Sequence, residues 1–136
     1  MGGSLPQNLI DFIIRKFPKY SNCKILLETG TFKGDTVESL KNIFDKIFTI
    51  ELNDELYFNA VKKFSESPKV KCIHGDSKME LEKILKYDIS EPTLFYLDAH
   101  FSGVMNGTAT SKSDIDVPLI YEIKSIMKYS YNNNII

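Results

Sequence analysis

Four acidic residues end or closely follow four apolar stretches of this 136-residue chain: Glu28, Glu51, Asp76 and Asp98. Each apolar stretch predicts a strand, and in an open parallel sheet the carboxyl ends of the strands border the crevice that binds ligands. A single acid at such an end could simply cap the next helix. Four acids in register favour a ligand site instead, because each carboxylate offers two acceptor oxygens to ligand hydroxyl or amino groups.

A glycine-containing turn follows the first of these acids. Gly30 and Gly34 bracket a short loop between the apolar run and the next predicted helix. A strand–turn–helix of this kind directs free backbone N–H groups towards the crevice, where nucleotide-like ligands bind. Asp35, with Glu38 three residues later, predicts an N-cap and a capping box for that helix.

The elements that must position these residues alternate along the chain. The run from Thr93 to Asp98 is almost continuously apolar, which is typical of a parallel strand buried on both faces. Ser77 and Glu80 repeat the capping-box pattern before another helix. Strands are predicted at 24–28, 46–51, 70–74 and 93–98, and helices at about 5–17, 35–44, 53–64, from 77 onwards and at 117–129. This alternation predicts an α/β fold, a doubly wound parallel sheet with right-handed crossovers.

Composition limits the class of protein. With 43% hydrophobic and 26% charged residues, we expect a single globular domain spanning residues 1–136. A net charge of −1 gives no electrostatic basis for binding nucleic acid or an anionic membrane. Two isolated cysteines disfavour a zinc site and a disulfide framework. Without an apolar run of membrane-spanning length or a signal pattern, a cytoplasmic protein is expected.

The acids and the turn together resemble the class I S-adenosylmethionine (SAM) methyltransferases. The first motif of that family is an acid, any residue, a glycine and a short loop to a second glycine, which residues 28–34 match. The match is best to the macrocin- and mycinamicin-type sugar O-methyltransferases, whose first motif also lacks a middle glycine. Asp98-Ala99-His100 is similar to their signature at the fourth strand, and the resemblance covers about residues 24–128.

The resemblance implies a role for each acid towards SAM. Glu51 would accept hydrogen bonds from both ribose hydroxyls, and Asp76 would face the adenine amino group. Leu52 and Ser77 would line the adenine, while Glu28 would organise the loop and the ammonium end of SAM. The implied SAM-binding residues are Glu28, Thr29, Gly30, Thr31, Phe32, Gly34, Thr36, Glu51, Leu52, Gly75, Asp76, Ser77 and Asp98.

The fourth strand end carries the candidate chemistry. Methyl transfer to an alcohol requires removal of the hydroxyl proton, and the pKa of histidine lies near neutrality, so His100 is a candidate general base. Asp98 could orient His100, contact the SAM ammonium group or ligate Mg²⁺, as in the sugar-methylating relatives. Two further acids that complete the magnesium site in those relatives have no counterpart here. Alternatively, His100 makes only a backbone hydrogen bond in the polar loop of residues 99–116.

The chain also departs from the family. A complete sheet in the family has seven strands, whereas only four are predicted here. The resemblance implies the order 3-2-1-4 for these four, with the C-terminal strands missing. The fourth strand would then be an exposed edge, and such edges invite pairing. We therefore expect that the chain is a fragment, or that a second copy, another chain or residues 131–136 cover the edge.

Three functions remain open at this point. The first is a SAM-dependent O-methyltransferase acting on a small hydroxylated, sugar-like substrate. The second is a nicotinamide-dependent oxidoreductase, in which Glu51 would also hold a ribose; the spacing of Gly30 and Gly34 does not match the G-x-G-x-x-G fingerprint of that class. The third is a non-catalytic, truncated domain that binds SAM or a partner.

Overall fold

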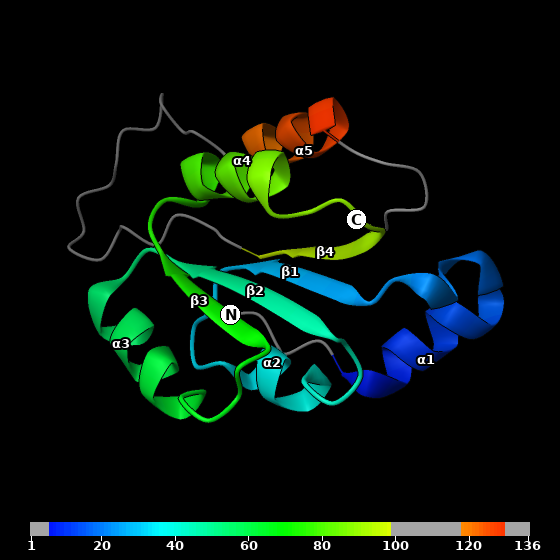
Figure 1. Ribbon diagram of the computed structural model, residues 1–136, viewed down its shortest axis with the longest axis horizontal. Helices are drawn as coiled ribbons and strands as arrows, with labels where there is room; N and C mark the ends of the chain where they lie inside the picture. The colour runs from blue at the N-terminus through cyan, green and yellow to red at the C-terminus, as the bar shows by residue number, and fades with distance from the viewer. Residues whose placement is uncertain (1–5, 99–117, 130–136) are drawn as a thin grey trace.

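The computed structural model describes residues 6–98 and 118–129 of the chain. Strands and helices alternate in it as the sequence predicts, and a short 3-10 helix, η1, joins the first helix to the first strand (Figure 1). The elements are α1 (Gln7–Lys16), η1 (Pro18–Asn22), β1 (Ile25–Thr29), α2 (Asp35–Leu40), β2 (Lys46–Glu51), α3 (Asp54–Lys63), β3 (Val70–His74), α4 (Ser77–Tyr87), β4 (Thr93–Leu97) and α5 (Pro118–Tyr129).

The described strands form one four-stranded parallel sheet in the order β3-β2-β1-β4, which confirms the predicted topology. β1 lies inside the sheet, with β2 on one side and β4 on the other. Register pairs Glu28 with Thr49 of β2 and with Tyr96 of β4, and Thr49 in turn with Cys72 of β3. All four strands therefore end along one edge of the sheet, where the four acids were expected.

Helices cover both faces of the sheet. α4 and α5 lie on one face, while α1, α2 and α3 lie on the other (Figure 1). Alternate residues of β1 point to opposite faces, so Leu27 joins the core beneath α4 and α5, whereas Leu26 joins the core beneath the other three helices. Burial on both faces explains why β4 is almost continuously apolar, whereas β3, at one edge of the sheet, is only partly buried and contains Lys71.

The two predicted capping boxes are wrong by one residue. Gly34, in the left-handed conformation at φ +83°, is the N-cap of α2, so Asp35 is the first helical residue and makes no side-chain cap. In α4 the cap is Asp76, whose carboxylate accepts the N–H of Lys78 at 2.9 Å. Ser77 is therefore inside the helix, and its hydroxyl is free of the capping role that was expected.

Other boundaries differ by small amounts. The helix predicted at 35–44 ends at Leu40, because the N–H of Ile43 returns to the Leu40 carbonyl three residues back and tightens the chain into a turn. The first helix covers Gln7–Lys16 of the predicted 5–17, and η1 was not predicted. Among the helices of residues 6–98 and 118–129, none is long and apolar enough to cross a membrane.

Candidate functional site

Glu51, the last residue of β2, has a carboxylate held by two backbone amides. Its Oε2 accepts the N–H of Phe32 at 2.8 Å, and its Oε1 accepts the N–H of Asn53 at 2.9 Å. A carboxylate has about four lone-pair sites, so two remain for further donors. The residue is 8% exposed, and the following Leu52 is 63% exposed. Glu51 therefore ties the turn after β1 to the start of α3.

Hydrogen bonds to β2 hold the turn between β1 and α2, so the backbone N–H groups that the sequence predicts to be free for a ligand are already used at Gly30, Thr31 and Phe32. The N–H groups of Gly30 and Thr31 both reach the carbonyl of Ile50, at 2.8 and 3.3 Å. Gly30, Phe32 and Gly34 all have positive φ, at 88°, 51° and 83°. Phe32 is a bulky side chain in a region that such residues rarely adopt, and its ring is 55% exposed. The bond to Glu51 holds this strained residue in place.

Glu28 lies beneath the turn instead of facing the crevice. It is 1% exposed, and Thr49 Oγ1 donates to its Oε2 at 2.6 Å. Thr49 Oγ1 also lies 2.6 Å from Thr31 Oγ1, and since the Thr49 proton is used on Glu28, Thr31 donates there. This chain of hydroxyls connects the buried acid to the turn, and the predicted contact of Glu28 with a ligand remains a prediction.

Burial raises the pKa of Glu28 and of a nearby thiol, that of Cys72. It raises the pKa of Glu28 to about 8; the hydrogen bond from Thr49 lowers this pKa, and the charges of Asp98 and Glu51 raise it. Burial also raises the pKa of the neighbouring Cys72, with a smaller contribution from Glu28. The Glu28 carboxyl is thus largely protonated at neutral pH.

Asp76 and its neighbours follow β3 at the same edge of the sheet. The N–H of Gly75 donates to the Glu51 carbonyl at 3.0 Å, which places this turn next to the end of β2. Asp76 uses Oδ1 to cap α4 through the N–H of Lys78. The sequence left open whether Asp76 caps a helix or binds a ligand. Because the cap uses only Oδ1, the second carboxylate oxygen can still accept a hydrogen bond from a ligand.

Asp98 follows β4 and is anchored by its backbone. Its N–H donates to both the carbonyl and Oγ1 of Thr29, each at 3.1 Å. Thr29 and Thr36, two of the predicted ligand residues, are themselves buried. His100 lies outside the described residues.

Sequence reasoning missed Glu122. This residue of α5 is 1% exposed and accepts the hydroxyl hydrogens of Ser77 and Thr29. Its position on the buried face, four residues before Ile126, was the available signal, because an acid on the apolar stripe of an amphipathic helix requires polar partners.

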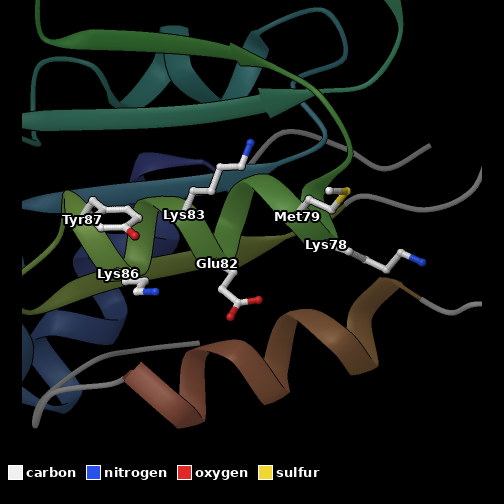
Figure 2. Close-up of a pocket in the computed structure, with 6 residues that line it drawn as sticks. All are labelled: Lys78, Met79, Glu82, Lys83, Lys86 and Tyr87. Carbon is white, nitrogen blue, oxygen red and sulfur yellow. The ribbon is translucent and has the colours of Figure 1, made fainter.

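A hollow of about 320 Å³ lies along α4 (Figure 2). All of its lining residues come from this one helix: Lys78, Met79, Glu82, Lys83, Lys86 and Tyr87. None of the four strand-end acids lines it, so it is not the predicted crevice. Among the described residues, no group of three His, Cys, Asp or Glu side chains is arranged to hold a metal ion.

Solved structures share this fold. A SAM-dependent methyltransferase from Clostridium acetobutylicum matches with a TM-score of 0.57 at 19% identity, over 91% of this chain and 46% of that one. SAM-bound CalS10, an amino pentose methyltransferase from Micromonospora echinaspora, matches with a TM-score of 0.54 at 15% identity, over 94% of this chain and 47% of that one. A precorrin 8w decarboxylase from Methanobacterium thermoautotrophicum matches with a TM-score of 0.57 at 12% identity, over 98% of this chain and 62% of that one. The sequence matches no protein-family model and no curated protein.

These similarities show that the chain has the Rossmann-like fold of SAM-dependent methyltransferases. The chain spans about half the length of the two methyltransferases and 62% of the decarboxylase. Because a decarboxylase is among the similar structures, the fold by itself does not determine the reaction. That conclusion must come from the residues of the site.

Proposed function

We propose that this chain binds SAM and acts as a methyltransferase on a hydroxyl group of a small, sugar-like molecule. The observation that carries the proposal is the position of Glu51 at the end of β2. The backbone N–H groups of Phe32 and Asn53 donate to its carboxylate and hold this acceptor beside the glycine turn. The fold supports the choice of cofactor, since the similar CalS10 structure contains SAM. The sugar class is supported by the resemblance of the first and fourth strand-end motifs and by the amino pentose substrate of CalS10.

The residues present fit the polar groups of SAM. Glu51 has two lone-pair sites left for the ribose diol, and Asp76 has one carboxylate oxygen beyond its cap for the adenine amino group. The exposed side chain of Leu52 provides an apolar surface next to Glu51 for the adenine ring. The turn from Gly30 to Gly34 would hold the methionine part, with Thr31 supported from below by Thr49.

SAM would supply an electrophilic methyl group on a sulfonium. The chain must then bring the acceptor hydroxyl in line and take up its proton. In this proposal His100 accepts the hydroxyl proton, and Asp98 orients His100. The backbone N–H of Asp98 is itself hydrogen-bonded to Thr29 at the end of β1. We include no magnesium in this proposal.

Calorimetric titration of the chain with SAM and with NAD tests the cofactor. We expect heat of binding from SAM and none from NAD; the reverse result would favour an oxidoreductase and overturn the proposal. Glu51→Gln should weaken SAM binding at least tenfold, since a carboxylate that accepts from hydroxyl groups contributes roughly 1.5–3 kcal/mol. Glu55→Gln is the matched control, because Glu55 is exposed in the first turn of α3.

A methylation assay on candidate sugars tests the chemistry separately. His100→Ala should lower kcat by about 10²–10⁴-fold while the affinity for SAM stays within a factor of three. Unchanged turnover in this variant would remove His100 from the base role. SAM binding without methylation of any tested acceptor would leave a binding domain that lacks the catalytic half.

A further inference from the structure

Glu122 is a buried acid that the proposed function does not use. It lies on α5, which packs on α4, and is 1% exposed. Burying a carboxyl group is unfavourable unless hydrogen bonds compensate. Apolar contacts such as those of Ile126, also 1% exposed, already pack α5 against the sheet, so packing does not require an acid at this position.

Both oxygens of Glu122 contact hydroxyl groups at the strand ends. Oε2 accepts from Ser77 Oγ, and Oε1 accepts from Thr29 Oγ1 at 3.4 Å. Thr29 ends β1 immediately before Gly30, and Ser77 is the first residue of α4, immediately after Asp76. One side chain of α5 thus bonds to residues that adjoin both turns proposed to hold the cofactor.

A third strand end is connected through Thr29. The N–H of Asp98 donates to the carbonyl and Oγ1 of this same threonine. Moving Glu122 away would leave Ser77 Oγ and Thr29 Oγ1 without this acceptor in a buried location. Ser77 Oγ would then need a new acceptor, and Thr29 Oγ1 would lose its bond to Glu122 while keeping the bond from the Asp98 N–H, so the residues beside both turns would shift.

We propose that Glu122 is a positioning residue that couples the docking of α5 to the shape of the cofactor site. The inference rests on the proposed SAM-binding function. Because coupling between two events is reciprocal, SAM stabilises docked α5 to the same extent that docked α5 improves the binding of SAM. Glu122 itself does not contact SAM in this proposal; it acts through Thr29 and Ser77.

The test compares two acids at the α4–α5 interface. Glu122→Ala removes the contacts to the strand ends, whereas Glu82→Ala removes a contact remote from them, the bond from Tyr129 to Glu82 at 3.2 Å. Affinity for SAM is measured by calorimetry, and hydrogen exchange of residues 118–129 is measured with and without SAM. Glu122→Gln retains one acceptor oxygen, and it replaces the alanine variant in the test if that variant does not fold.

In the wild type we expect SAM to slow amide exchange in α5. Glu122→Ala should weaken SAM binding about tenfold and abolish this slowing, with Glu122→Gln in between. Glu82→Ala should speed α5 exchange without SAM, yet retain the slowing and bind SAM within a factor of three of wild type. Wild-type affinity in both Glu122 variants would overturn the coupling alone; absence of SAM binding in the wild type would instead overturn the proposed function, and this inference with it.

Discussion

Glu28 shows how the site depends on a residue that does not face it. Burial raises its pKa to about 8, whereas an ordinary glutamate has a value of 4.5. Between these two values the folded chain holds a proton that the unfolded chain has released. Stability therefore falls as pH rises through this window, and the contribution of Glu28 is least favourable above about pH 8.

The corresponding variant is Glu28→Gln, which keeps the acceptor for Thr49 and cannot ionise. Urea denaturation at pH 5 and pH 9 should show a smaller loss of stability with pH in the variant than in the wild type. The difference should amount to a few kcal/mol, since each pKa unit is about 1.4 kcal/mol. Glu55→Gln should show the wild-type pH dependence. Parallel pH profiles for wild type and Glu28→Gln would mean that Glu28 is ionised in the folded state.

Asp76 combines a structural role with a proposed ligand role, and two substitutions separate them. Asp76→Asn retains the oxygen that caps α4, so the free energy of unfolding should stay within about 0.5 kcal/mol of wild type. Asp76→Ala removes the cap and should cost about 1 kcal/mol. Both should weaken SAM binding, which calorimetry would measure; full affinity in Asp76→Asn would leave Asp76 as a cap only.

At the scale of elements, the turn from β1 to α2 depends on a glycine with two independent constraints. Gly34 has a φ of +83°. A Cβ at this position would lie 3.0 Å from the ring of Phe64, the residue that follows α3. An alanine would therefore be strained in its backbone and crowded by a buried side chain.

Gly34→Ala should lower the free energy of unfolding by about 1–3 kcal/mol, measured by urea denaturation. The double variant with Phe64→Leu separates the causes, because leucine removes the crowding ring but not the positive φ. If crowding contributes, the alanine will cost less in the Phe64→Leu background than in the wild type. A cost that is negligible in both backgrounds would show that the turn rearranges freely.

The strands could be predicted from the sequence because a parallel sheet buried on both faces favours apolar runs, whereas their order was an expectation from the resemblance to the methyltransferase family. Strand bounds agree to within one residue, and β2 and β3 agree fully. The helix starts were displaced because acids and serine are common both as N-caps and in the first turn, so the pattern at Asp35 and Ser77 fits either position. Only the backbone conformation shows that Gly34 and Asp76 are the caps.

At the scale of the whole molecule, the sequence predicted that the four acids lie along one edge of the sheet. The edge shared by the four acids follows from topology, and their common location needs no side-chain information. What sequence could not give is which acids face the crevice: Glu28 is buried below the turn, while Glu51 is held at its rim. Glu122 was missed because its partners, Ser77 and Thr29, are distant in sequence and meet it only when α5 packs on α4.

The interior position of β1 also has a consequence for the order of folding. One helix separates β1 from β2 along the chain, whereas three helices and two strands separate β1 from β4. Closing the longer loop costs more chain entropy and delays pairing. We expect the β1–β2 pair to form in the transition state and β4 to join afterwards.

Kinetic analysis of two matched core variants checks this order. Ile47→Ala in β2 should slow folding, whereas Leu94→Ala in β4 should mainly speed unfolding; both residues belong to the same buried cluster. Equal effects on the folding rate would contradict it. If the order holds, the hydrogen bonds from Asp98 to Thr29 form in the last step, so a newly made chain acquires its compact sheet before it acquires a complete ligand site.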